Sequence, residues 1–309
     1  MKKFIRKTGT TTDIIVIAAL AAFFVVLAGQ LIGEALTTLF TTPNLETENP
    51  ALAIGLQYFS FIGIWIVLAL MMLFPKNRTM LKALLPNKLG NNLVGCVIAI
   101  LIGFGMNAFC VMMSILRKDI AISLWYTEPL KLILLFLAVF IQSGAEELVC
   151  RWYLYQKLTR RYKSPLVAFI GNAVFFCALH LLNPGINVFG MTQIVVIALL
   201  LSVMVYYYDW LWGAMLVHTA WNFTQNLIFG LPNSGIVSPY SLYHLDAASD
   251  GFFFNPAFGV EGSPGACVII VVVLIILIAI AKKKNLKPVD IWAEQEAELE
   301  AKEAEAQAA

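Results

Sequence analysis

Two acidic residues and one arginine lie inside a strongly apolar stretch of this sequence, in the run GAEELVCR at 144–151. On a helix, Glu147 and Arg151 are four residues apart, so they share a face and can pair. Glu146 points about 100° away from that face, and we expect it to have no partner on its own helix. Since an apolar environment strengthens a carboxylate as a base, Glu146 is a candidate general base or acid.

Two of the three histidines also fall inside apolar runs. His180 ends the run FCALH, four residues after Phe176, and His218 begins the run HTAWN, four residues before Asn222. The second pair presents two hydrogen-bonding groups to one point. The third histidine, His244, lies in a polar loop, where we expect an ordinary surface residue.

These residue types together could hydrolyse an amide bond without a metal. A carboxylate and a histidine can activate water, while a second histidine and an asparagine amide can donate to a developing oxyanion. The chain contains no H-E-x-x-H sequence and no G-x-S-x-G sequence. We expect no cofactor. Because two histidines and a glutamate could hold Zn²⁺, metal catalysis stays open as a minor alternative.

The composition decides the broad class of protein. Of 309 residues, 60% are apolar and only 13% are charged, with a mean hydropathy of +0.80. Soluble domains carry roughly a quarter charged residues, so we expect a polytopic membrane protein. A net charge of +2 gives no reason to expect a nucleic-acid partner. The five cysteines are scattered without a C-x-x-C pair, which is typical of small hydrophobic residues.

Apolar runs long enough for about eight membrane-spanning helices divide the chain. They fall at 14–40, 51–74, 92–116, 130–157, 165–182, 191–208, 211–229 and 266–281. The segments on one side of such a topology hold nearly all the basic residues: Lys2, Lys3, Arg6, Lys7, Lys76, Arg78, Lys82, Lys88, Lys157, Arg160, Arg161, Lys163, Lys282, Lys283, Lys284 and Lys287. The opposite loops hold acidic residues, Glu261 among them. The positive-inside rule therefore places both termini in the cytoplasm.

The expected fold class is an all-α polytopic membrane protein of about eight transmembrane helices. A polar active-site cavity would lie between spans four, five and seven. We divide the chain into N-terminal spans (1–129), a core carrying the three motifs (130–230), an extracytoplasmic loop with the last span (231–289) and an acidic cytoplasmic tail (290–309). The tail is expected to be a solvated helix without a packed core.

The ordered motifs E-E-x-x-x-R, F-x-x-x-H and H-x-x-x-N resemble those of the CAAX protease and bacteriocin-processing family. These are intramembrane glutamate endopeptidases related to the type II CAAX prenyl endopeptidase. The resemblance covers about 130–230 and implies a role for each motif residue. Glu146 would activate water with help from His180, and His218 and Asn222 would form the oxyanion hole. The resemblance further implies that Glu147 and Arg151 orient the site and that Phe176 packs beside His180.

The leading hypothesis is an intramembrane endopeptidase of a bacterial plasma membrane. Its partners would be membrane lipids and a peptide or membrane-protein substrate, and its role would be peptide maturation or bacteriocin self-immunity. One alternative is a non-catalytic membrane scaffold or immunity protein that keeps the polar cluster for folding or binding. Another is a transporter, since intramembrane ionisable residues also mark ion paths, although the sequence shows no inverted repeat.

Overall fold

The apolar run that carries the two glutamates forms one continuous helical rod of three parts. These are α6 (Pro129–Glu147), the π-helical segment η3 (Leu148–Leu154) and α7 (Tyr155–Arg161). The computed structural model describes residues 4–126 and 128–308. Pro129 at the first helical position fits the start of α6 because its missing N–H is not needed there.

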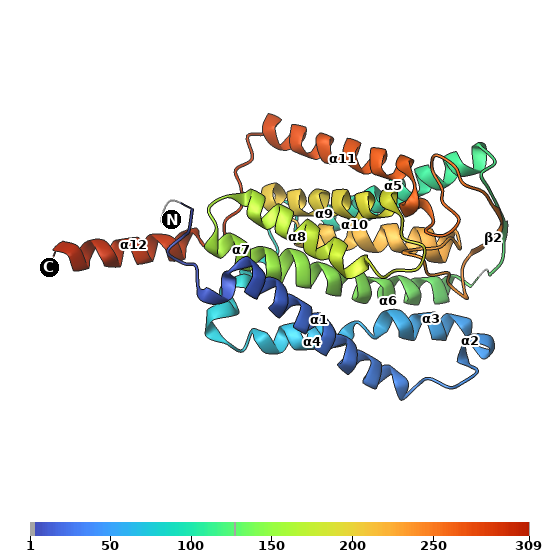
Figure 1. The fold of residues 1–309 in the computed structure, drawn as a ribbon, viewed down its shortest axis with the longest axis horizontal. Coiled ribbons are helices and arrows are strands. Elements are labelled where there is room, and N and C mark those ends of the chain that lie inside the picture. Colours follow the sequence, from blue (N-terminus) through green and yellow to red (C-terminus); the bar gives the residue numbers. More distant parts are fainter. Residues whose placement is uncertain (1–3, 127, 309) are drawn as a thin grey trace.

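The other apolar runs also fold as helices, arranged as a bundle of rods along one long axis (Figure 1). Their bounds are α1 (Ile15–Thr38), α3 (Pro50–Phe59), α4 (Ile62–Met71), α5 (Leu93–Leu116), α8 (Pro165–His180), α9 (Val188–Tyr208), α10 (Leu211–Phe223) and α11 (Pro264–Lys283). Shorter elements are η1 (Thr11–Asp13), α2 (Leu45–Glu48), η2 (Pro75–Leu84), η4 (Thr224–Ile228) and η5 (Val260–Gly262).

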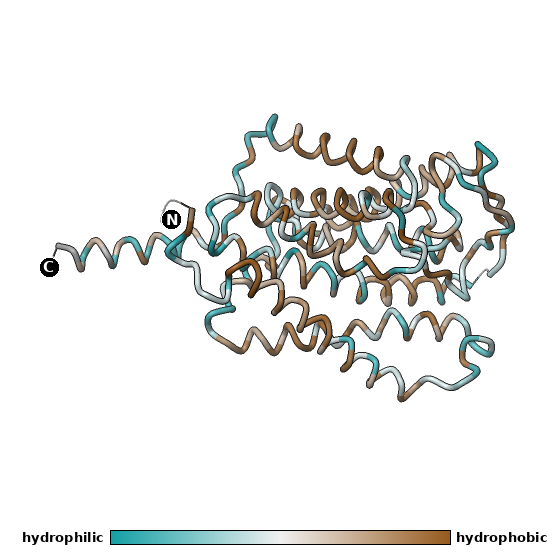
Figure 2. Tube along the Cα trace, in the orientation of Figure 1, coloured by the Kyte–Doolittle hydropathy of each residue, from teal (hydrophilic) through white to brown (hydrophobic). Residues whose placement is uncertain are grey.

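The predicted class, an all-α polytopic membrane protein, is confirmed. Within the described ranges, six helices are long and apolar enough to cross a membrane, and α3 and α4 together count as one of them. The tube in Figure 2 is brown along the rods and teal mainly toward the two ends of the bundle. Because α8 and α10 are shorter than the six, the count of eight spans stays a prediction.

Close backbone contacts join the helices around α10 and α1. A Cβ added to Gly103 on α5 would lie 2.3 Å from the carbonyl oxygen of Val217, so α5 and α10 touch along their backbones. On α1, Gly29 approaches Ile64 of α4 and Gly33 approaches the carbonyl oxygen of Ser60 just before α4, and a Cβ on Gly63 would lie 2.0 Å from the oxygen of Gly29. Small residues four apart allow this approach between membrane helices.

Both termini lie at one end of the bundle, where α12 (Ala293–Ala308) projects away from it (Figure 1). The opposite end carries the antiparallel strands β1 (Ile120–Leu124) and β2 (Tyr243–Ala248). His244 on β2 is exposed and bonds Asp246, as predicted for a surface residue. Three of the predicted basic segments meet, since Arg160 donates to the carbonyl oxygen of Lys76 at 2.9 Å and the backbone N–H of Lys163 donates to Phe4 at 3.1 Å; Lys2 and Lys3 lie outside the described residues.

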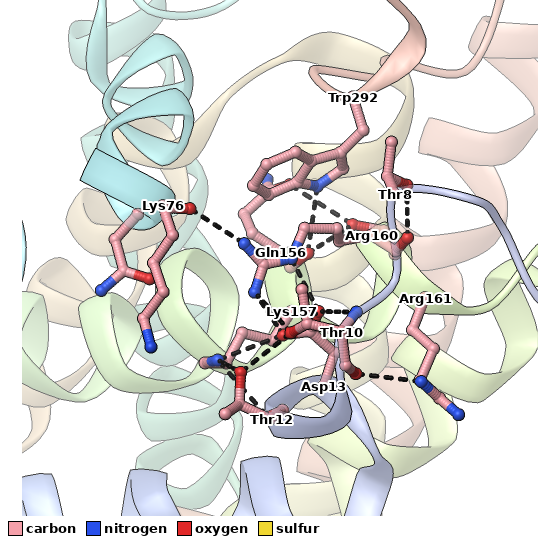
Figure 3. A network of polar contacts seen from close by, with 12 residues as sticks. Thr8, Thr10, Thr12, Asp13, Lys76, Gln156, Lys157, Arg160, Arg161 and Trp292 are labelled. Atoms are coloured by element: carbon pink, nitrogen blue, oxygen red, sulfur yellow. Dashed lines mark hydrogen bonds and ion pairs between the residues drawn. The ribbon is translucent and has the colours of Figure 1, made fainter. Parts of the chain in front are cut away.

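A buried ionic network ties this end together (Figure 3). Asp13 is fully buried, and it accepts hydrogen bonds from Arg160 (Nε to Oδ2, 2.7 Å) and Lys157 (Nζ to Oδ1, 3.1 Å). Burial alone would raise the pKa of Asp13, but the hydrogen bond and charge of Arg160, with Lys157, hold it below its usual value. The network fixes the start of α1 against α7.

The acidic tail is anchored at its first residues. Trp292 is only 1% exposed, its Nε1 donates to the carbonyl oxygen of Gln156 at 3.0 Å, and the Arg160 guanidinium lies 5.0 Å from the centre of its ring. The expectation that the tail has no packed core is therefore wrong at Trp292. An indole buries a large apolar surface, which fixes the chain just before the exposed α12.

Candidate active site

Glu146 lies one residue before the end of α6 and faces a cavity. Its Oε1 accepts a hydrogen bond from Gln142 Nε2 at 2.6 Å. The expectation that Glu146 has no partner on its own helix is therefore wrong, because Gln142 lies one turn earlier on the same face. Its other oxygen, Oε2, is buried without a hydrogen-bond donor in the described part of the chain. Gln142 thus fixes the carboxylate and leaves one acceptor oxygen for another molecule.

Glu147 and Arg151 form the predicted pair, with both side chains fully buried. Arg151 Nη1 lies 2.9 Å from Glu147 Oε1, across the junction of α6 and η3. The Arg151 guanidinium also lies 4.6 Å from the centre of the Phe176 ring. A cation over an aromatic face is attracted to it, so this ion pair connects the rod to α8.

His218 lies between the two glutamates, which the sequence analysis did not predict. Its Nδ1 is 3.0 Å from Glu147 Oε1, and its Nε2 is 3.7 Å from Glu146 Oε2. Since an ionised carboxylate only accepts hydrogen bonds, Nδ1 carries the hydrogen in that contact. Glu147 thereby fixes the ring with Nε2 turned toward Glu146. A partner 71 residues away in sequence gives no spacing signal that could reveal this contact.

His180 ends α8 and lines the same cavity. Its Nδ1 lies 2.8 Å from the carbonyl oxygen of Phe176, and the two rings pack with centroids 4.6 Å apart. Because a carbonyl only accepts, Nδ1 carries the hydrogen and Nε2 is the unprotonated nitrogen of the neutral ring. The expected packing of Phe176 beside His180 is present, and Phe176 also meets His218 edge to face.

Asn222 lies one turn after His218 on α10 and is 6% exposed. Its Nδ2 donates to Gln142 Oε1 at 3.3 Å and to Ser143 Oγ at 3.4 Å, and its Oδ1 accepts from Asn233 Nδ2 at 3.3 Å. The amide hydrogens of Asn222 thus point toward the side chain that holds Glu146.

One cavity of about 320 Å³ brings Glu146, His180, His218 and Asn222 together from α6, α8 and α10. Its walls extend beyond the three predicted spans. Polar side chains from outside those spans that line it are Gln30, Gln57, Tyr58, Asn183, Gln193, Asn233 and Glu261. Gln30, Gln57 and Gln193 interrupt apolar runs, and that signal was available in the sequence. Glu261 was assigned only to an acidic loop, and its place at the site is a correction.

No resident metal or cofactor follows from the arrangement of side chains. Across residues 4–126 and 128–308, no group of three or more His, Cys, Asp or Glu side chains is arranged to hold a metal ion. The five cysteines are free thiols, three of them buried, as expected for small hydrophobic residues. Hydrolysis without a cofactor remains a prediction for this site.

Comparison with known proteins gives one match. Residues 128–224 match the family model described as type II CAAX prenyl endopeptidase Rce1-like. The matched segment is about a third of the chain, and it contains all three motifs, from Glu146 to Asn222. No curated protein and no solved structure matches the chain.

Proposed function

We propose, from the match over residues 128–224, that this chain is a member of the CAAX protease family and an intramembrane endopeptidase of the glutamate type. Membership of this family indicates a protease in a multi-pass membrane protein. The finer proposal concerns which residues perform the hydrolysis. The observation that carries it is the position of Glu146 Oε2, without a donor and 3.7 Å from His218 Nε2 in a shared cavity.

In this proposal Glu146 acts as general base and then as general acid. Oε2 accepts a proton from a water molecule as the water oxygen attacks the carbonyl carbon of the substrate. The tetrahedral intermediate then collapses, the carbon–nitrogen bond breaks, and Glu146 returns the proton to the leaving amine. The hydrogen bond from Gln142 holds the carboxylate in place throughout. His180 assists by accepting a hydrogen bond from the same water at its Nε2.

His218 and Asn222 stabilise the negative charge that develops on the carbonyl oxygen. The Asn222 amide already points into the cavity, and its contacts there are long, at 3.3 and 3.4 Å, so an oxyanion is a better acceptor. His218 donates through Nε2 once that nitrogen is protonated. Donors held in place before reaction cost little reorganisation and account for much of such catalysis.

We further propose a bacterial plasma membrane with both termini in the cytoplasm. The support is the basic cluster at the end that carries the termini (Figure 3), together with the positive-inside rule. The substrate would be a membrane-associated peptide or protein, because apolar helices from both halves of the chain enclose the cavity.

The test compares peptides and protein termini in cells that produce the wild type or Glu146→Gln at matched membrane levels. Glutamine keeps the volume and the contact to Gln142 but removes the base. The matched control is Glu128→Gln, the same substitution at the half-exposed start of α6.

A processed terminus made by the wild type and the control, but not by Glu146→Gln, supports the protease and identifies its substrate. Identical termini in all three strains, with any deletion phenotype rescued equally, would overturn it. The polar cluster would then serve a scaffold or an immunity protein.

A further inference from the structure

Glu261 is a buried carboxylate at the cavity that the proposed hydrolysis does not use. It lies in η5, just before α11, and is 5% exposed. Burial raises its pKa, and the hydrogen bonds that it accepts lower the pKa by less, so the net shift is upward. Among the residues that the structure describes, no lysine or arginine lies within ion-pair distance of it. A buried carboxylate without a cation is costly, so its neighbours must account for its presence.

Four neutral donors surround this carboxylate. Trp221 Nε1 and Asn233 Nδ2 each lie 3.1 Å from Oε1. On the other oxygen, Oε2 accepts from the backbone N–H of Ser234 at 2.7 Å and from its hydroxyl at 3.3 Å. Glu261 therefore holds the loop at 233–234 against α10.

These contacts set the direction of a chain of amides. Because Oε1 of Glu261 is an acceptor, Asn233 must present its amide nitrogen, and that same Nδ2 also donates to Asn222 Oδ1 at 3.3 Å. With its oxygen occupied, Asn222 can present only its NH₂ group to the cavity. We propose that Glu261 is a positioning residue that, through Asn233, fixes the Asn222 amide with its donor side toward the reacting carbonyl.

The orientation holds in either protonation state of Glu261. A neutral carboxyl group carries one proton, and on Oε2 that proton has the Ser234 hydroxyl as an acceptor. Oε1 then stays an acceptor for Asn233. The raised pKa therefore does not disturb the direction of the amide chain.

The kinetic consequence rests on the proposed function, and a double-mutant cycle tests it. The purified protein, reconstituted in lipid vesicles, is assayed with quenched fluorescent peptides ending in a Cys-aliphatic-aliphatic-X sequence, with and without a farnesyl group on the cysteine. Glu261→Met removes the acceptor for Asn233, so the Asn222 amide is no longer held with its NH₂ group toward the substrate carbonyl. Because that group stabilises the oxyanion only in the transition state, we expect kcat to fall ~10–100-fold with KM unchanged. Glu261→Gln can keep an oxygen toward Asn233, but its NH₂ group then faces the backbone N–H of Ser234 without accepting from it, so we expect a smaller fall in kcat than with Glu261→Met.

In the background of Asn222→Ala, Glu261→Met should cause no further loss of kcat. A full additional loss would show that Glu261 acts independently of Asn222 and would overturn the proposal. Ser234→Gly controls for loop anchoring, since it removes one contact to Oε2 and leaves the contact to Asn233.

Exchanging the donor and the acceptor between residues 233 and 261 distinguishes positioning of Asn222 from simple anchoring of the loop. Asn233→Asp cannot donate to Asn222, and adding Glu261→Gln restores a contact between 261 and 233 without restoring that donation. The double variant should recover stability and remain slow. If it recovers wild-type kcat, Glu261 serves only to anchor the loop, and the proposal is wrong.

An activity-independent measurement separates this inference from the proposed function. In protein labelled with ¹⁵N at asparagine, the side-chain NH₂ signal of Asn222 is identified by its loss in Asn222→Ala. Glu261→Met should shift that signal, and Ser234→Gly should leave it in place. No shift with Glu261→Met would overturn the inference. If Glu261→Met shifts the signal while cells with the wild type and with Glu146→Gln show identical processed termini, the inference stands and the proposed function alone is contradicted.

Discussion

Oε1 of Glu147 lies 3.0 Å from His218 Nδ1 and 2.9 Å from Arg151 Nη1, so one oxygen holds a residue of η3 and a residue of α10. The contact to Arg151 is buried, and the contact to His218 is partly buried at the cavity. The bond to His218 turns its Nε2 toward Glu146, and the bond to Arg151 holds the carboxylate that makes this possible. Glu147 therefore determines where the histidine of the proposed oxyanion hole can point.

Breaking the pair of Glu147 and Arg151 should be strongly destabilising. Glu147→Ala leaves a buried guanidinium without its carboxylate, and we expect the free energy of unfolding in detergent micelles to fall by about 3–5 kcal/mol. The double variant Glu147→Met with Arg151→Met removes both charges and should cost less than Glu147→Ala alone. If the loss in the double variant equals the sum of the losses in Glu147→Met and Arg151→Met, the pair contributes no coupling to stability and the proposed role of the pair is wrong.

Asn222→Ala should lower kcat by ~10²–10³-fold and leave KM nearly unchanged, because an oxyanion donor acts in the transition state. The same vesicle assay measures both constants. Thr219→Val, on the buried face of α10, controls for packing, since the Thr219 hydroxyl bonds only the carbonyl of Met215. A rise in KM with kcat unchanged would instead identify Asn222 as a binding residue for the resting substrate.

Stability should depend on pH through Asp13. Its folded-state pKa lies below its usual value, so its stabilising contribution is fully present above about pH 4, the ordinary range for Asp, and is lost as pH falls through the folded-state pKa. The difference in unfolding free energy between the wild type and Asp13→Asn should therefore be constant from neutral pH to about pH 5 and shrink in more acidic solution. Asp250→Asn, in the exposed loop at the opposite end of the bundle, is the matched control. A difference that grows on acidification would contradict the ionic network.

The sequence was sufficient to predict the membrane class, the helical segments and the residues that meet at the cavity, because charge within apolar runs is costly and therefore conspicuous. Apart from the pair of Glu147 and Arg151, it did not predict how those residues pair. Gln142 is uncharged and one turn away from Glu146, so nothing marked it as a partner. The contact of His218 with Glu147 depends on the way α10 packs against α6, which no local spacing encodes.

Glu261 shows the same limit for the loops. In sequence it belongs to an acidic extracytoplasmic segment, and charge counts gave it only a topological meaning. The turn at η5 buries it beside Asn233 and Trp221, and this arrangement depends on tertiary packing of the segment between α10 and α11. Trp292 is comparable, because a lone tryptophan in a charged tail has no periodicity that could predict its contacts with α7.

Trp292→Ala should release the acidic tail. Its indole is buried against Gln156 and Arg160, whereas α12 beyond it is exposed. Loss of the indole leaves the ion pairs of Arg6 with Asp290 and Glu296, the ion pair of Lys82 with Glu294 and the backbone hydrogen bond from Val289 to Tyr206. Exposed ion pairs stabilise by only ~0–1 kcal/mol, and we expect protease to remove residues 284–308 at least tenfold faster than in the wild type. Trp125→Ala, a half-exposed tryptophan near the other end of the bundle, should leave that rate unchanged. Because Trp292 does not line the cavity, peptide cleavage by Trp292→Ala should stay within about twofold of the wild type. If protease cuts the tail of Trp292→Ala no faster than that of the wild type, Trp292 is not its anchor.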